Sequence, residues 1–162
     1  MAEDGKVLIE EEPATGRAAG QCLKRYYEEL NQRFEAGFDP RKSVLGSLDE
    51  FSPPKGSFLV VRMDGEPVGC GGIKLFGREY GELKRMYVRP QHRGHGFGKL
   101  ILDHLAQFAR VDEITLLRLE TGIHQRAAIR LYENAGFYRI PPFGPYTDDP
   151  LSLCYEKRIV RS

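Results

Sequence analysis

The sequence predicts one α/β domain, spanning residues 1–162, with a mixed sheet of six or seven strands and helices on both faces. Three observations support this prediction. A strand, a glycine turn and a helix follow one another from Glu82 to about Arg110, and an apolar run at 114–121 completes a crossover between two parallel strands. Asp64-Gly65 separates two other apolar runs, which is a strong signal for an antiparallel hairpin. Amphipathic helical patterns lie before and after this strand-rich region.

The N-terminal third is expected to form one strand and one long helix. A short apolar patch within 6–12 suits a strand, and Pro13 ends it. Apolar residues then recur at three- and four-residue steps to about residue 36, which predicts a helix with one apolar face. This stripe contains Ala19, Cys22, Leu23, Tyr26, Leu30 and Phe34. The polar, proline-containing stretch 37–56 predicts a loop around a short helical turn near 44–50.

The middle of the chain is expected to form three consecutive strands, of which the first two are antiparallel. The runs at 58–61 and 68–76 flank the Asp64-Gly65 turn. Glycines inside the second run predict a bulge or a close backbone approach, because glycine weakens a regular strand; they are Gly69, Gly71 and Gly72. The third strand, 82–88, alternates apolar and polar residues and is closed by Pro90.

The C-terminal third is expected to alternate strands and helices. The Leu-rich run at 114–121 predicts a buried strand, and 125–135 predicts a helix whose C-terminal cap is Gly136. A strand begins at 137–140, a loop rich in proline and glycine follows, and 151–160 predicts the last strand of the sheet.

Composition narrows the class of protein. The hydrophobic content of 41% is enough for a core, and the net charge of +1 argues against a general nucleic-acid or membrane binder. The three cysteines have no metal-site spacing, which favours buried or partly buried thiols in a reducing cytoplasm. We expect a cytoplasmic monomer or homodimer, because the first five residues are acidic and no stretch approaches membrane-spanning length.

The glycine turn has the chemistry of an anion site. Gly94, Gly96 and Gly98 alternate, and a helical pattern begins directly behind them. The first turn of a helix has unpaired N–H groups and the positive end of the helix dipole, so it attracts phosphate. Positive or titratable side chains surround the turn: Arg89, His92, Arg93, His95 and Lys99. The spacing fits neither the phosphate loop of ATPases nor the dinucleotide fingerprint.

Two separated segments resemble one family. Gln91-His92-Arg93-Gly94-His95-Gly96 matches the Q/R-x-x-G-x-G/A signature of the GNAT acetyltransferases, and Val88-Arg89-Pro90 before it is typical of them. Leu119-Glu120-Thr121 and the run Leu131–Phe137 resemble the family's second signature region. The resemblance covers roughly 58–137, and the segment before it matches in pattern only.

The resemblance implies a site for acetyl-CoA as cosubstrate. The strands ending at Val88 and Thr121 would splay apart, and the pantetheine arm would enter the gap and bond to the backbone of the first strand. The pyrophosphate would rest on the amides of the glycine turn. Gln125 stands where the family usually has Asn, which is a departure. The implied cofactor-binding residues are Met86, Tyr87, Val88, Gln91, His92, Arg93, Gly94, His95, Gly96, Phe97, Gly98, Lys99 and Gln125.

The resemblance also implies catalytic roles. Tyr132 matches the family's general acid, against the simpler interpretation that it packs with its hydroxyl at the surface. Glu120 and Glu82 are both candidate bases. Strand alternation turns Glu120 away from the face that Leu117 and Leu119 bury, which favours Glu120. Either carboxylate would act through a water, and a pKa near 4.3 suits this role poorly unless burial raises it.

The predicted function is transfer of acetyl from acetyl-CoA to a primary amine, on a small molecule or a protein N-terminus. The alternative is a non-catalytic acetyl-CoA-binding or regulatory module, which would not need Tyr132. Four aromatic residues either pack in the core or line the acceptor side: Tyr26, Tyr27, Phe34 and Phe38. We expect no metal, because the histidines lack ligand spacing, and no nucleic-acid or membrane partner.

Overall fold

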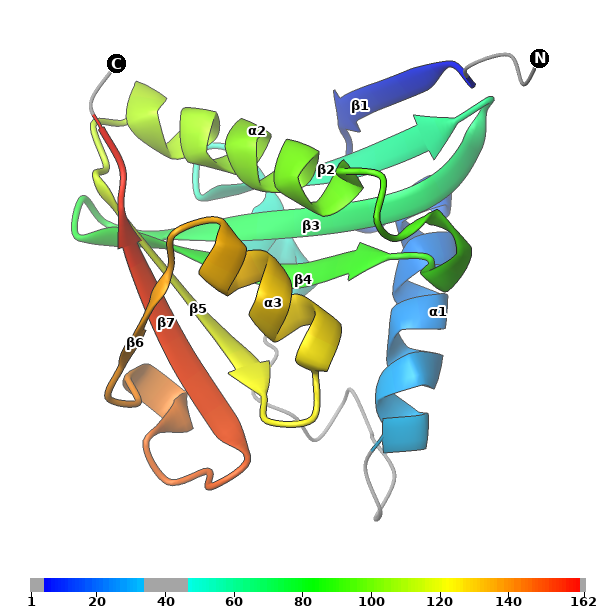
Figure 1. The fold of residues 1–162 in the computed structure, drawn as a ribbon. Coiled ribbons are helices and arrows are strands. Elements are labelled where there is room, and N and C mark those ends of the chain that lie inside the picture. Colours follow the sequence, from blue (N-terminus) through cyan, green and yellow to red (C-terminus); the bar gives the residue numbers. More distant parts are fainter. Residues whose placement is uncertain (1–4, 34–46, 161–162) are drawn as a thin grey trace.

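The computed structural model describes residues 5–33 and 47–160, and Figure 1 shows a mixed sheet with helices on both faces. The sheet has seven strands in the order β1-β2-β3-β4-β5-β7-β6. The strands are β1 (Val7–Glu11), β2 (Gly56–Met63), β3 (Glu66–Phe76), β4 (Tyr80–Val88), β5 (Leu116–Gly122), β6 (Tyr138–Ile140) and β7 (Ser152–Arg158). The helices are α1 (Arg17–Arg33), α2 (Phe97–Val111) and α3 (Arg126–Asn134), with short 3₁₀ segments η1 (Leu48–Phe51), η2 (Pro90–His92) and η3 (Gly144–Tyr146). The predicted fold class is confirmed.

Two apolar clusters cover the two faces of the sheet. Strand alternation divides β2 between them, so that Leu59 and Val61 join the cluster under α2 and α3, whereas Phe58 and Val60 join the cluster under α1. Ile101 of α2 is fully buried in the first cluster. The apolar stripe of α1 supplies Ala19, Cys22 and Leu23 to the second. The sheet therefore separates an α2/α3 side from an α1 side.

The predicted hairpin is confirmed. β2 and β3 pair antiparallel around Asp64 and Gly65, whose φ values are 51° and 85°. Two positive φ angles match the twist of a tight two-residue hairpin, which is why Asp-Gly suits it.

The glycines of β3 mark a close approach, as predicted. The register between β3 and β4 shifts between Cys70 and Gly72. A Cβ on Gly71 would lie 2.5 Å from Met86 Sδ and 2.6 Å from Ile101 Cγ2, so only glycine fits between β4 and α2. Opposite this shift, Arg85 of β4 has a φ of 60°, which a non-glycine residue adopts only at a cost. The bulge thus lies in the middle of β4.

The central strands β4 and β5 separate after a short parallel contact. Their paired residues are Gly81 with Leu117, Glu82 with Arg118, and Leu83 with Leu119. Beyond Leu83 the two strands diverge (Figure 1). This opening, between 84–88 of β4 and 120–122 of β5, is called the splay below.

Some predicted boundaries shift by a few residues. β5 begins at Leu116 and not at Ile114, because the N–H of Ile114 still bonds to Ala109 O of α2 at 3.0 Å. The predicted helical turn is the 3₁₀ segment η1, with Ser47 as its N-cap. The part of that prediction before residue 47, the end of the first helix beyond residue 33, and Phe34 and Phe38 lie outside the described residues. None of the helices in the described part is long and apolar enough to cross a membrane.

Candidate active site

The glycine turn leads into the N-terminus of α2, and its three glycines have different structural roles. Gly94 and Gly96 both have a φ of 83°, and a Cβ on either would meet nothing within 4 Å. Backbone conformation, and not space, therefore requires glycine at these two positions. Gly98 lies within α2, where a Cβ would come 2.8 Å from Leu131 Cδ2. It lets α2 and α3 pack closely, so only two of the three predicted glycines shape the anion-binding turn.

Part of the positive charge around this turn is paired within the chain. The Arg93 Nη2 atom bonds both carboxylate oxygens of Glu29 on α1, at 2.9 and 2.8 Å, and its Nε donates to Val88 O at 2.9 Å. Arg93 thus ties the turn to α1. Lys99 forms an exposed ion pair with Asp103 at 2.9 Å. The anion-binding capacity of the turn therefore rests first on the N–H groups and dipole of α2.

Three polar side chains from different elements influence one another electrostatically near the splay: Tyr26 of α1, Glu120 of β5 and Tyr132 of α3. Burial, and then the charges of Tyr26 and Glu120, raise the pKa of Tyr132. Burial and Glu120 likewise raise the pKa of Tyr26. The three groups are therefore within electrostatic reach of one another. Tyr132 is buried, and its ring packs against Phe137 at a centroid distance of 5.8 Å.

Glu120 has an unusual proton affinity for a carboxyl group. Burial, together with the charges of Asp149 and Glu82, raises its pKa to about 7, against the opposing effects of a hydrogen bond from Ser152 and the charge of Lys84. Loss of water penalises the carboxylate form, so the group holds its proton up to neutral pH. A carboxyl that exchanges a proton near pH 7 is suited to acid–base work at that pH.

Glu82 lies on the same side of the sheet as Glu120 but has closer partners. Its Oε2 atom accepts a hydrogen bond from the Tyr146 hydroxyl at 3.3 Å and lies 3.5 Å from Lys84 Nζ. Lys84 Nζ also lies 3.4 Å from Glu50 Oε2. Burial raises the pKa of Glu82, while Lys84 and Tyr146 lower it. Both predicted candidate bases are thus present at the α1 side.

The remaining predicted residues surround these groups. Met86 and Val88 are partly buried on the α2 side of β4, and Tyr87 is buried on the α1 side. Gln125 occupies the N-cap position of α3, where its N–H bonds to Gly122 O at 3.0 Å. The rings of His92 and His95 lie beside Phe97, at centroid distances of 6.5 and 6.3 Å. Gln91 lies in η2, before the turn.

Three residues of this region were not predicted. Arg85 at the bulge is buried, with its Nε 3.2 Å from the Tyr27 hydroxyl and its guanidinium over the Phe51 ring. Lys84 follows Glu82 by two positions, so strand alternation was a signal that could have placed both on one face. Tyr146 lies in the loop before β7, where no local pattern indicates the path of the chain.

The thiols and histidines form no candidate metal centre in the described ranges, since no group of three or more His, Cys, Asp or Glu side chains there could hold a metal ion. Cys22, Cys70 and Cys154 are free and buried, as expected.

Comparison with known proteins places these features in one family. Residues 23–137 match the acetyltransferase (GNAT) family. An IAA acetyltransferase of Azospirillum brasilense is 40% identical over 131 residues, which cover 80% of this chain and 86% of that protein. The N-alpha-acetyltransferase RimI of Mycobacterium tuberculosis is 31% identical over 133 residues, covering 80% of this chain and 81% of that protein.

Solved structures share the fold. A Klebsiella pneumoniae protein, assigned by inference as an acyl-CoA N-acyltransferase, is 34% identical with a TM-score of 0.77, covering 95% of this chain and 98% of that one. The PaiA N-acetyltransferase of Thermoplasma acidophilum, crystallised with coenzyme A, is 17% identical with a TM-score of 0.70 over 94% of this chain and 99% of that one. The family match contains the glycine turn, the splay and Tyr132, and the chain therefore belongs to the GNAT family of acetyl-CoA-dependent acetyltransferases.

Proposed function

We propose that the protein transfers acetyl from acetyl-CoA to a primary amine by direct attack of the amine on the thioester. The observation that carries this proposal is that Glu120 and Tyr132 lie within electrostatic reach of each other near the splay, beside the strand that leads into the glycine turn. The reaction needs an amine that loses a proton and a thiolate that gains one. A carboxyl that titrates near neutral pH and a buried phenol supply both roles in one place.

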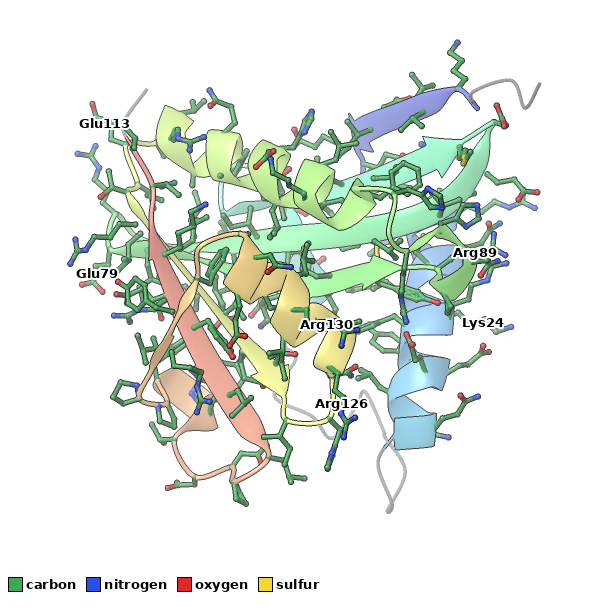
Figure 2. The ribbon with its side chains drawn as sticks, viewed as in Figure 1. Lys24, Glu79, Arg89, Glu113, Arg126 and Arg130 are labelled. Atoms are coloured by element: carbon green, nitrogen blue, oxygen red, sulfur yellow. The ribbon has the colours of Figure 1, made fainter. Side chains whose placement is uncertain are left out.

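The cosubstrate is proposed to lie along β4 and the start of α2. The backbone of Met86 and Val88 has no β5 partner in the splay. Val88 O already accepts from Arg93 Nε, and the other backbone groups facing the splay are proposed to bond an extended pantetheine arm. The N–H groups from Arg93 to Gly98 and the dipole of α2 favour the pyrophosphate. Arg126 and Arg130 project from α3 on the side that faces α1 in Figure 2, and add exposed positive charge near the opening.

Glu120 is the proposed base. An alkylammonium has a pKa near 10, and an ordinary carboxylate accepts its proton poorly. Burial raises the pKa of Glu120 to about 7, which reduces this mismatch while leaving the group ionised above neutral pH. Glu120 is also partly exposed, whereas Glu82 is only 2% exposed, so Glu120 is the carboxylate that a water or an amine can reach.

Tyr132 is the proposed acid for the departing thiolate. A raised pKa keeps its phenol protonated throughout the working pH range, and the thiolate of CoA regains a proton most readily from a group held at its sulfur. The negative charge of Glu120 raises the pKa of Tyr132 by repelling the phenolate. Once Glu120 has taken the proton of the amine, this repulsion is gone and Tyr132 gives up its proton more readily.

The acceptor class is tested with a panel of primary amines. The similar proteins include one named for IAA and one named an N-alpha-acetyltransferase, so the panel contains small amines, amino acid derivatives, an aminoglycoside and peptides with free N-termini. Release of free CoA thiol is recorded together with the mass of the acceptor. The proposal expects stoichiometric thiol release and one acetyl group gained on nitrogen for at least one class. Thiol release without acetylated product for every class would contradict it.

A further inference from the structure

The two carboxylates at the splay have different surroundings. Glu82 and Arg118 are register partners on adjacent parallel strands, and Glu120 lies two residues beyond Arg118. Leu83, Leu117 and Leu119 belong to the cluster on the α2/α3 side. By alternation, Glu82 and Glu120 therefore both face the α1 side, on neighbouring strands.

Glu82 has two partners that stabilise its carboxylate form. A single oxygen, Oε2, receives both the Tyr146 hydroxyl at 3.3 Å and the Lys84 ammonium at 3.5 Å. The side chains of Glu82 and Lys84 are only 3% and 8% exposed. Burial raises the pKa of Glu82, and the Lys84 ammonium and the Tyr146 hydroxyl oppose this rise because both stabilise the carboxylate. Its position also leaves little room for an incoming amine.

In the described part of the chain, polar and titratable groups from several elements influence Glu120. Lys84 and Glu82 face it from β4, Ser152 and Cys154 from β7, and Asp149 and Tyr146 from the loop before β7, while Tyr26 and Tyr132 approach from α1 and α3. Asp149 and Glu82 are the two negative charges that raise the pKa of Glu120. Asp149 is exposed and screened by salt, whereas Glu82 is buried and screened little.

We infer that Glu82 is a positioning residue: its buried charge, fixed by Lys84 and Tyr146, makes Glu120 a stronger proton acceptor for the incoming amine. This inference rests on the proposed role of Glu120 as base. It assigns the two carboxylates different roles, one accepting the proton and the other acting only through its charge. The inference also assigns a role to Lys84 and Tyr146, which stabilise and orient the carboxylate of Glu82.

Glu82→Gln tests the inference with little structural disturbance. The amide oxygen still accepts from Tyr146, and Lys84 keeps Glu50 as an ion-pair partner. Glu120→Gln removes the proposed base, and Asp149→Asn removes the exposed charge. Glu11→Gln, on the exposed edge strand β1, is the matched control that changes an equal charge far from the splay. The measurement is kcat/KM against pH, at low and at high salt.

The expected result is an acidic limb that survives in Glu82→Gln but moves to lower pH by about half a unit or more, because a like charge has been removed. This shift persists in high salt, whereas any shift in Asp149→Asn shrinks. Glu120→Gln loses the limb and Glu11→Gln leaves it in place. A ¹³C titration of the Glu120 carboxyl, assigned by its absence in Glu120→Gln, should show the same shift without turnover.

The outcomes separate the inference from the proposed function. An acidic limb and a ¹³C titration that do not move in Glu82→Gln, with the limb lost in Glu120→Gln, overturn the inference alone. Loss of the limb in Glu82→Gln but not in Glu120→Gln makes Glu82 the base and overturns both. If every variant keeps an unmoved limb, neither carboxylate is the base, and the inference falls with the proposed role of Glu120.

Discussion

At the scale of single residues, burial adapts ordinary side chains to proton transfer. In water, the carboxyl of a residue such as Glu120 has a pKa near 4.3, and the phenol of a residue such as Tyr132 has a pKa near 10. Burial raises the pKa of each group. The pKa of the carboxyl moves close to neutral pH, and the phenol stays protonated. The same desolvation that suits the groups to catalysis costs folding free energy, because the native state must hold a poorly hydrated carboxylate above neutral pH.

Removal of the Tyr132 hydroxyl tests the acid. Tyr132→Phe is expected to lower kcat by about 10², the usual contribution of a positioned proton donor, with CoA affinity nearly unchanged. Stopped assays of thiol release and calorimetry with CoA measure the two quantities. Tyr138→Phe is the matched control, because Tyr138 is exposed and its hydroxyl bonds Glu156 of β7, on the strands far from the splay. Full activity in Tyr132→Phe would leave that residue a packing role alone.

A second residue-scale prediction concerns stability against pH. Glu120 has a folded pKa of about 7 against an ordinary value of 4.5, so the penalty for its ionised form is absent below about 4.5, grows between these values and is complete above 7. Glu120→Gln removes that penalty. Relative to wild type, its free energy of unfolding should gain on the order of 2 kcal/mol between pH 5 and pH 8. Urea unfolding at both pH values measures it, and a pH-independent difference would show that the carboxyl is not perturbed.

At the scale of elements, glycines decide how closely helices and strands approach. Gly71 lets α2 cross β3 beside the β4 bulge, and Gly98 lets α2 meet α3. Gly94 and Gly96 instead supply the positive φ angles that turn the chain into α2. The site is thus built around two close approaches and one sharp turn.

Gly71→Ala should destabilise the fold by about 1–3 kcal/mol, because its Cβ would overlap Met86 and the fully buried Ile101. Gly20→Ala is the matched control in α1, where a Cβ meets nothing within 4 Å. Helix propensity predicts that the control gains about 0.5–1 kcal/mol. Urea midpoints at unchanged m-values measure both. Equal effects of the two substitutions would contradict the packing argument.

Gly96→Val is expected to weaken CoA binding tenfold or more, about 1.4 kcal/mol, because valine disfavours the φ of 83° that aims the backbone N–H groups of the turn. Calorimetry measures the affinity. Gly77→Val, in the turn between β3 and β4, carries a similar strain at a φ of 57° with an equally open Cβ position. It should lose stability but bind CoA normally. Unchanged CoA affinity in folded Gly96→Val would show that the phosphates of CoA do not bind at the glycine turn.

At the scale of the whole molecule, one continuous sheet is held by few register pairs at its centre. β4 and β5 share only three register pairs, whereas β5 and β7 share seven. A ligand that lies in the splay and supplies backbone partners to β4 would join the two halves of the sheet.

CoA should therefore stabilise the whole fold, by about 2.7 kcal/mol when its concentration is 100 times the Kd. Hydrogen exchange of amides in 84–88 should slow more on binding than exchange in β1, at the far edge of the sheet. Thermal unfolding and exchange mass spectrometry test these outcomes. Stabilisation without added protection in β4 would place the ligand outside the splay.

Local patterns in the sequence were enough to predict most helices and strands, the glycine turn and the side of β5 on which Glu120 lies. Asp64-Gly65 specified its hairpin through φ preferences, and alternation placed Glu120 opposite Leu117 and Leu119. The glycine turn was predicted because glycine at positive φ before a helical stripe is a local property. These signals act over a few residues, which is why the predicted element boundaries shifted only slightly. Strand alternation could also have predicted that Lys84 shares a face with Glu82.

Only the tertiary structure decided which distant side chains meet. Tyr26 reaches Glu120 and Tyr132 across the splay, Tyr146 bonds Glu82 from 64 residues away, and Arg93 turns from the glycine turn to α1. Each contact depends on how sheet, helices and loops close around one another. The proton affinity of Glu120 follows from that closure, because burial and neighbouring charges exist only once the chain has folded.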